Sequence, residues 1–216
     1  MELKDGLRGR RSIRKFLPRP VPDEIVREIL GEARWSPSWA NTQAWHVSVV
    51  TGASLRRLAE ANRTAATSEA PAGPDFRMPR AWPEHLAART RRLFELRSSI
   101  ASPAGADAEA TGPAAFYGAP CVLFVTVEAG LETDYALFDC GILVQSLCLA
   151  AHDKGLGTCI MAMAVRDPDA LRAVLPHAAG RRFVIGVALG YPDEQAEINR
   201  FDRERAPLDE IVTWAE

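Results

Sequence analysis

The sequence YALFDCGILVQSLCLAA, residues 135–151, is the most apolar segment of the chain. Asp139 and Gln145 interrupt it, which makes it a poor membrane span. Apolar residues on almost every side of a helix are typical of a helix buried in a protein core. We therefore expect residues 134–153 to form the central helix of a soluble protein.

Strand-forming segments lie on both sides of this helix. Apolar runs occur at 121–127, 157–164 and 183–191, and the first and last of them are rich in valine. Between the last two runs, DPDALRAVL at 167–175 has Asp167 directly before a proline, which is a typical helix start. These segments predict strands packed against the central helix.

The first part of the chain adds two helices and a strand. DEIVREILGEARW, residues 23–35, has acidic residues in its first turn and apolar residues on one face, as an amphipathic helix does. HVSVVTG, residues 46–52, alternates like a strand, and a helix over 54–66 follows with Ser54 as its expected N-cap. The tail is expected to hold one short amphipathic helix. Together these elements predict an α+β layered fold, a short, mostly antiparallel sheet wrapped by helices.

Residues 67–115 differ in composition from the segments around them. An irregular, proline-rich part covers 67–83, a charged helix is expected over 84–100, and alanine, glycine, proline and serine dominate 101–115, which we expect to be mobile. This insertion is too weakly apolar to form a domain of its own. We predict one domain over 1–216 with an insertion at about 67–115.

Overall composition excludes several classes of protein. The chain has 216 residues, of which 47% are hydrophobic, and a formal net charge of −2, which argues against a general nucleic-acid binder. The N-terminus lacks the apolar core of a secretory signal. Four cysteines lie in apolar stretches without a C-x-x-C spacing, and we expect buried, reduced thiols: Cys121, Cys140, Cys148 and Cys159. The sequence therefore predicts a soluble cytoplasmic protein with no membrane or nucleic-acid partner and no metal site.

The sequence has none of the common catalytic motifs. G-x-S-x-G, H-E-x-x-H, a phosphate loop and G-x-G-x-x-G are all missing, and the four histidines are scattered along the chain. An enzyme with this sequence would take its chemistry from a cofactor.

Three polar clusters are candidates for binding such a cofactor. Arg10, Arg11, Ser12 and Arg14 together can surround a phosphate with charge-assisted hydrogen bonds. A second cluster can bind the amide-like edge of a ring: Ser38, Asn41 and Gln43. In a third, Arg203 and Arg205 are two residues apart, so both project from one side of an extended segment.

The order and spacing of these clusters resemble the nitroreductase family of FMN-dependent oxidoreductases. The matching segments are RRSIRKF (10–16), PSWANTQAW (37–45), GLGTCIMA (155–162), VIGVALGYP (184–192) and RERAPLDEIV (203–212). They span nearly the whole chain apart from the insertion. The combination of the first two segments, about two dozen residues apart, is quite specific for this family.

The resemblance implies that the basic N-terminal segment binds FMN. Arg10, Arg11 and Ser12 match the phosphate and ribityl site, and Arg14 matches the cation beside the N1/O2 edge of the flavin ring. Such a cation favours hydride acceptance, because reduced flavin carries negative charge at N1. Arg203 and Arg205 match a C-terminal phosphate clamp.

Two further segments receive roles from the resemblance. Ser38, Trp39, Asn41 and Gln43 match a loop that reaches the flavin of a partner subunit. Residues of the segment after Gly157 match the one whose backbone N–H groups lie near flavin N5: Met161, Ala162 and Met163.

The resemblance also implies an assembly and a lid. Members of the family are homodimers with FMN at the subunit interface and an extended C-terminal arm, and 134–153 matches the dimer-forming helix. The insertion resembles that of members acting on nitrobenzoate or nitrobenzene, and we expect a lid that carries ring-stacking and anion-pairing side chains: Phe76, Arg77, Trp82 and Phe94. Ala44 stands where many relatives carry proline, and Ala162 or its neighbour stands where some members have a carboxylate and others a glycine. Both departures bear on substrate preference.

Three functions are compatible with these sequence features. The first is an NAD(P)H-dependent FMN enzyme that reduces nitroaromatic or quinone-type acceptors by ping-pong hydride transfer through flavin N5. The second keeps the flavin but acts as a dehydrogenase or reductase of an azoline, enone or aldehyde. The third is a basic-armed nucleic-acid-binding protein.

Overall fold

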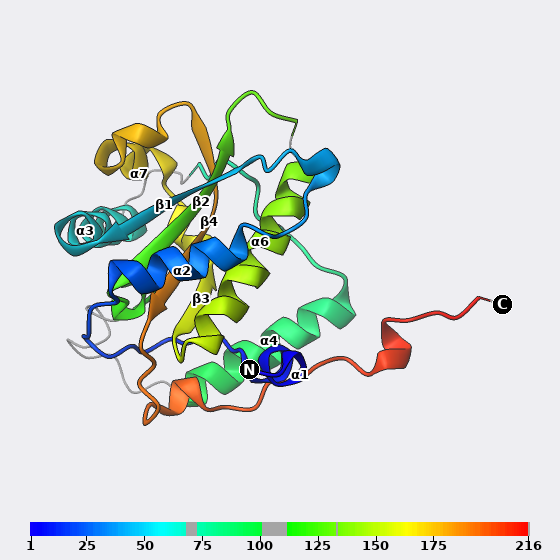
Figure 1. Cartoon of the computed structure of the whole chain (residues 1–216). Helices are drawn as coiled ribbons and strands as arrows, with labels where there is room; N and C mark the ends of the chain where they lie inside the picture. Colours follow the sequence, from blue (N-terminus) through cyan, green and yellow to red (C-terminus); the bar gives the residue numbers. More distant parts are fainter. Residues whose placement is uncertain (68–72, 101–111, 133, 216) are drawn as a thin grey trace.

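Four strands form one sheet in the part of the chain that the structure describes, with the order β1-β2-β4-β3 and antiparallel pairing throughout (Figure 1). The structure is a computed structural model and describes residues 1–67, 73–100, 112–132 and 134–215. The strands are β1 (Trp45–Thr51), β2 (Cys121–Glu128), β3 (Gly157–Met161) and β4 (Arg181–Gly190). The mostly antiparallel sheet expected from the sequence is confirmed.

The position of β2 in the middle of the layered fold explains why its sequence is apolar throughout. Its side chains alternate between the two faces of the sheet. Leu123 and Val125 belong to the hydrophobic cluster on one face, whereas Val122 and Phe124 belong to the cluster on the other. Because both faces are covered, both sets of side chains have to be apolar.

Helices cover each face of the sheet. On one face lie α2 (Asp23–Ala33) and α6 (Asp134–Asp153), and on the other α3 (Gly52–Thr67) and α7 (Pro168–Val174), with the 3-10 turn η2 (Pro113–Gly118) beside them (Figure 1). This arrangement confirms the α+β layered fold, a sheet wrapped by helices.

Helix α6 is a core helix, as its sequence predicts. It is the one helix among the described residues that is long and apolar enough to cross a membrane, but it packs against α2 and the sheet. Leu147 is fully buried in that contact. Tyr135 and Phe138, in contrast, are 67% and 68% exposed, so one side of the helix is not covered by the described residues.

The basic N-terminal segment runs beside β3. A short helix that the sequence did not predict, α1 (Leu3–Gly9), precedes it. The N–H of Ile13 donates to the carbonyl of Thr158 at 2.8 Å. A Cβ on Gly157 would lie 2.4 Å from Cγ1 of Ile13, so only glycine allows this close approach.

Three details of the sequence-based assignment are wrong. Helix α3 begins at Gly52, so Ser54 lies inside it and its hydroxyl accepts a hydrogen bond from Arg57 instead of capping the helix. Strand β3 ends at Met161, where the chain turns into η3 (Ala162–Val165). The expected helix of the tail is only the 3-10 turn η6 (Leu208–Glu210).

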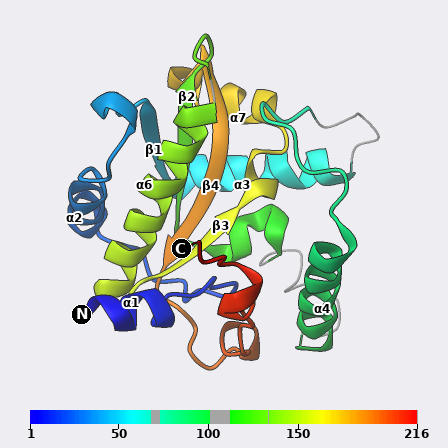
Figure 2. The same ribbon diagram turned by 90° about the vertical axis from the view of Figure 1, so that its right-hand side faces the viewer.

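The insertion is attached to the body at its beginning. The carboxylate of Asp75 accepts hydrogen bonds from Arg172 at 2.6 Å and from the N–H of Phe183 at 2.8 Å. Helix α4 (Glu84–Ile100) then stands to one side of the layered body (Figure 2). The expectation that 101–115 is mobile falls mainly on residues outside the described part of the chain.

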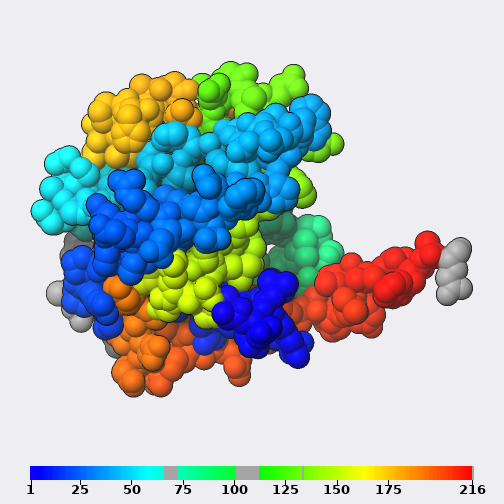
Figure 3. Space-filling model, in the orientation of Figure 1, coloured from blue at the N-terminus to red at the C-terminus, as the bar shows by residue number. Residues whose placement is uncertain are grey.

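After β4 the chain returns to the N-terminal segment and then leaves the body. The remaining 3-10 turns are η1 (Trp39–Asn41), η4 (Pro176–Ala178) and η5 (Glu197–Asn199). Beyond η5 the chain is irregular apart from the turn η6, and its end projects away from the rest of the molecule (Figure 3). We call residues 201–215 the C-terminal arm.

Candidate functional site

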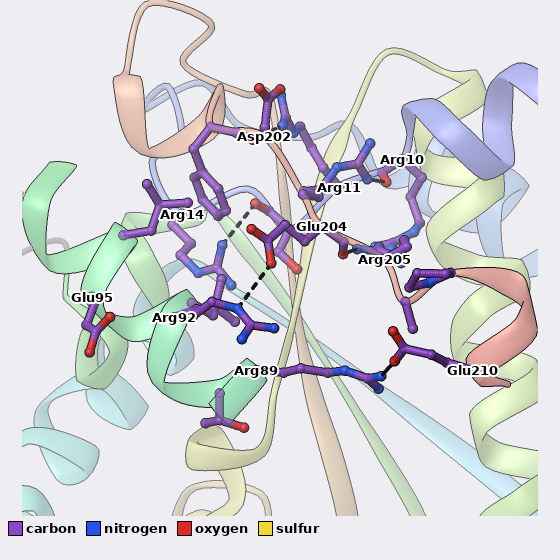
Figure 4. Close-up of a pocket in the computed structure, with 18 residues that line it drawn as sticks. Arg10, Arg11, Arg14, Arg89, Arg92, Glu95, Asp202, Glu204, Arg205 and Glu210 are labelled. Atoms are coloured by element: carbon purple, nitrogen blue, oxygen red, sulfur yellow. Dashed lines mark hydrogen bonds and ion pairs between the residues drawn. The ribbon is translucent and has the colours of Figure 1, made fainter. Parts of the chain in front are cut away.

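A cavity of about 880 Å³ lies where the two ends of the chain meet α4 (Figure 4). The basic N-terminal segment and the start of the C-terminal arm form one wall, and α4 forms the other. The described residues that line it are Arg10, Arg11, Ser12, Arg14, Arg89, Thr90, Arg92, Leu93, Glu95, Leu96, Phe201, Asp202, Arg203, Glu204, Arg205, Ala206, Pro207 and Glu210. Six of the residues predicted from the sequence are therefore together: the N-terminal cluster and both arginines of the arm.

Backbone contacts hold the two ends of the chain together. Arg11 donates to the carbonyl of Phe201, and Arg203 donates to the carbonyls of Arg8 and Arg10. Some of the N–H donors of Arg11 and Arg203 are therefore used in hydrogen bonds to backbone carbonyls. Among the described residues, Arg205 donates only to the neighbouring Glu204 carbonyl, at 2.7 Å, so most of its donors are available to a ligand.

Asn199 is a positioning residue that the sequence analysis missed. Its side-chain oxygen accepts a hydrogen bond from the N–H of Arg14 at 2.7 Å, and its amide nitrogen donates to the carbonyls of Lys15 and Asp193 at 2.8 and 2.9 Å. Buried polar groups with all their hydrogen bonds made fix the backbone around them. Asn199 therefore sets where Arg14 enters the cavity. A lone asparagine in the sequence carries no signal of such a role.

The cavity carries an excess of positive charge. Seven arginines and four carboxylates are among its described lining residues. Burial, followed by the charges of Arg11, Arg205 and Arg10, lowers the pKa of Arg203. Nε of Arg10 and Nε of Arg14 are buried and have no hydrogen-bond partner among the described residues. Crowded guanidiniums with donors to spare are suited to bind an anion.

Helix α4 brings charged residues that the sequence analysis did not assign. Arg89 forms an ion pair with Glu210, and Nε of Arg92 lies 3.4 Å from Oε2 of Glu204 (Figure 4). Leu93 lies beside them on the cavity wall. The charged helix was predicted, but its packing partner, the C-terminal arm, is more than a hundred residues away in the chain, and composition alone does not identify it.

The four aromatic and basic residues predicted for a lid lie elsewhere. None of Phe76, Arg77, Trp82 and Phe94 is among the described residues that line the cavity. The ring of Phe76 stacks under Arg182, with the guanidinium carbon 4.0 Å from the ring centroid. Phe94 is exposed and lies near Arg97.

The predicted flavin-contacting loop lies away from this cavity, beside the first turns of α6. The N–H of Trp39 donates to Oδ2 of Asp139 at 3.0 Å, and the N–H of Gln43 donates to Oγ of Ser38 at 3.0 Å. Nε2 of Gln43 reaches Oδ1 of Asn41 at 3.1 Å. The loop contains non-glycine residues in the left-handed region: Ala40, Asn41 and Gln43. Residues with strained backbone conformations of this kind are often found at functional sites.

The other predicted cofactor segment begins at the end of β3. Met161 is buried, whereas Ala162 and Met163 are exposed in the turn η3 that follows. None of the three is among the described residues that line the cavity. The structure therefore brings together one part of the predicted cofactor site and leaves the loop at 38–43 and the segment 161–163 outside it.

The chain matches a known protein family. Residues 7–191 match the nitroreductase family. The chain is 34% identical to nitroreductase NfnB of Mycolicibacterium smegmatis over 97% of this chain and 91% of that protein. It is 32% identical to 4-nitrobenzoate reductase of Nocardioides sp., with 96% and 87% covered.

A solved structure agrees in fold as well as sequence. The crystal structure of the FMN-dependent nitroreductase NfnB from Mycobacterium smegmatis in complex with NADPH superposes with a TM-score of 0.89 and 32% identity, covering 99% of this chain and 97% of that one. The resemblance inferred from the sequence motifs is thereby confirmed, and the chain belongs to the nitroreductase family.

Proposed function

We propose that this protein is an FMN-dependent oxidoreductase that uses NAD(P)H to reduce nitroaromatic or quinone-type acceptors. The observation that carries the proposal is the arginine-lined cavity built from both ends of the chain. The FMN dependence of the NfnB structure and the names of the related nitroreductases support the choice of cofactor and acceptor. The relatives described above give no support to an azoline, enone or aldehyde substrate.

The residues of the cavity fit FMN. A phosphate monoester carries about two negative charges near neutral pH, and the lining residues have a formal excess of three positive charges. Within the described part of the chain, Arg10 and Arg205 have donors that no protein acceptor uses, and Nε of Arg14 is a further buried donor without a partner there. We assign Arg10, Arg11, Ser12, Arg203 and Arg205 to the phosphate and ribityl end and Arg14 to the ring.

Bound FMN would supply the redox chemistry by accepting hydride from NAD(P)H and passing two electrons to the acceptor. Within this scheme the chain has to bind and orient the flavin and stabilise the charge that reduction adds. Arg14 is positioned for the last task, because Asn199 fixes its backbone and Phe201 lies 5.9 Å from its guanidinium carbon, measured to the ring centroid. The described lining residues include no histidine or cysteine to act as an acid–base pair.

Steady-state kinetics test the proposed function. We expect the purified protein to be yellow and to oxidise NADPH or NADH with nitrobenzene or benzoquinone as acceptor. Donor and acceptor should use one site in turn, so double-reciprocal plots should give parallel lines. Intersecting lines would contradict the one-site scheme, and no turnover with either class of acceptor would contradict the proposed function itself.

We further propose a homodimer in which the 38–43 loop and the segment 161–163 complete the flavin site. Large exposed apolar residues on the open side of α6 and in this loop support the proposal, since patches of this kind mark interaction surfaces. The most exposed of them are Trp39, Tyr135 and Phe138. The loop has strained backbone geometry and lies away from the cavity of the same subunit. Both features fit a role at the flavin of the partner subunit.

Phe138→Asp is expected to weaken the dimer and to lower FMN content together. A charge in an apolar interface loses its hydration without gaining a partner, and the affinity of the subunits should fall at least tenfold. Sedimentation velocity and the flavin absorbance of the purified variant measure the two effects. The control is Val49→Asp, which places the same charge at an exposed position of the edge strand β1. A stable, yellow wild-type monomer would contradict the proposal.

A cytoplasmic location is part of the same proposal. All four cysteines are buried, as predicted. Burial, with a smaller contribution from Asp23, raises the pKa of the Cys121 thiol to about 12, and burial with Asp139 raises that of Cys140 to about 11. Thiols of this kind are unreactive and suit a reducing compartment.

A further inference from the structure

We infer that Asp139 of α6 is a positioning residue, which holds the 38–43 loop in the conformation in which it serves the flavin. The inference rests on the proposed homodimer, in which this loop completes a flavin site, and deepens it by naming the residue that fixes the loop. Asp139 interrupts the apolar run of α6 and does not line the cavity.

The carboxylate of Asp139 lies inside the protein. Asp139 is 3% exposed and shares the inner side of α6 with Ala136, Cys140 and Leu143. A buried carboxylate loses its hydration, and only hydrogen-bond donors that face the charge compensate for the loss. An apolar residue at this position would pack in the core without that loss. A carboxylate here therefore indicates a specific hydrogen-bond partner.

That partner is the backbone of the 38–43 loop. The N–H of Trp39 donates to Oδ2 of Asp139 at 3.0 Å. Trp39 is the first residue of η1, and the first N–H groups of a helical turn have no acceptor inside the turn. Ser38, directly before it, does not cap the turn, because its hydroxyl accepts from the N–H of Gln43 instead. Asp139 therefore caps η1 from a helix that is 100 residues away in the sequence.

The loop needs an anchor outside itself. Ala40, Asn41 and Gln43 have φ values of 47°, 57° and 48°, which residues other than glycine rarely adopt. Such conformations persist only when surrounding contacts hold them. Within the described part of the chain, the other hydrogen bonds of residues 38–43 join the loop to itself. The hydrogen bond to Asp139 is thus the one that ties the loop to the body.

Two neighbouring contacts with α6 do not replace it. The ring of Tyr135, about one turn before Asp139, lies 6.1 Å from the ring of Trp39, measured between centroids. About two turns after Asp139, Oγ of Ser146 lies 2.8 Å from Oγ of Ser36, which precedes the loop. Neither contact involves the loop backbone. Loss of the carboxylate should therefore release the backbone of 38–43 while the segment stays beside α6.

Hydrogen exchange together with FMN titration tests the inference. Asp139→Leu removes the acceptor and places an apolar residue in the core. In the FMN-saturated protein, we expect the amides of 38–43 to exchange about tenfold faster than in the wild type, whereas those of β1 and the melting temperature change little. The apoprotein of this variant should bind FMN about tenfold more weakly.

Two further variants separate positioning from a general effect on the fold. Asp139→Asn keeps an oxygen acceptor without the charge, so its exchange rate and FMN affinity should lie between those of Asp139→Leu and the wild type. Asp153→Leu is the control, since it removes an exposed carboxylate at the far end of the same helix, where Asp153 pairs with the amine of Met1. It should exchange and bind FMN as the wild type does.

Wild-type exchange of residues 38–43 in Asp139→Leu would overturn the inference, and so would wild-type FMN affinity. Asn41→Ala distinguishes the second result from a failure of the proposed function, because it changes the loop and leaves Asp139 in place. If Asn41→Ala weakens FMN binding and Asp139→Leu does not, the inference alone is wrong. If neither does, the proposed role of the loop at the flavin is wrong as well. If Asp139→Leu does not fold, Asp139→Asn is measured instead, and wild-type exchange of its loop would overturn the inference.

Discussion

Arg14→Met is expected to slow the reduction of bound flavin by NAD(P)H roughly tenfold to a thousandfold. The substitution keeps most of the length of the side chain but removes its charge. A fixed cation at a site where negative charge develops lowers the barrier by several kcal/mol, because it needs no reorganisation during the reaction. Asn199 holds the backbone of Arg14 through a 2.7 Å hydrogen bond, so the charge is placed before the reaction begins.

Stopped-flow absorbance of the flavin after mixing with NADPH measures this rate directly. Lys15→Met is the control, since it removes a positive charge from the neighbouring residue, which is exposed and does not line the cavity. Its flavin should be reduced at the wild-type rate. If Arg14→Met is also reduced at that rate, Arg14 does not stabilise the reduced cofactor.

Arg10→Ala and Arg205→Ala are each expected to weaken FMN binding on the order of a hundredfold. Each substitution removes a charge-assisted hydrogen bond to the phosphate. In a partly enclosed cavity, a hydrogen bond from water to the phosphate is weaker and does not make up for the loss. Arg205 makes its one described hydrogen bond to the adjacent Glu204 carbonyl, so its loss should leave the arm in place. Arg203→Ala would be harder to interpret, because Arg203 also ties the arm to the carbonyls of Arg8 and Arg10.

Fluorescence titration of the apoprotein with FMN measures these affinities. Arg8→Ala is the control, because the side chain of Arg8 does not line the cavity whereas its carbonyl, which accepts from Arg203, is unchanged. Wild-type affinity in both Arg10→Ala and Arg205→Ala would rule out the phosphate assignment.

Elements with a strong local pattern could be predicted from the sequence. Helix α6 has the predicted bounds, Asp134–Asp153, because an apolar run this long leaves little choice of structure. Helix α4 also has its predicted bounds, Glu84–Ile100. Helix α1 was missed because it has only seven residues, two of them glycines, and its apolar residues show no clear helical periodicity. It forms beside α6, a contact that the local sequence does not specify.

The candidate site could be predicted only in part. Guanidinium clusters at both ends of the chain suggested one shared anion, and the structure does bring Arg10, Arg14 and Arg205 to one cavity. Asn199 and Arg92 could not be predicted, because their roles come from tertiary contacts with residues far away in the sequence. The 38–43 loop was predicted correctly as a loop, but its role depends on a second subunit and stays a prediction.

The central claim is that both ends of the chain hold the phosphate of FMN. Titration of the apoprotein with FMN and with riboflavin, which lacks the phosphate, tests it most directly. The arginine-lined cavity predicts that FMN binds at least a hundredfold more tightly than riboflavin, and that Arg205→Ala reduces this difference by weakening FMN alone. Equal affinity of the wild-type protein for the two flavins would contradict the claim.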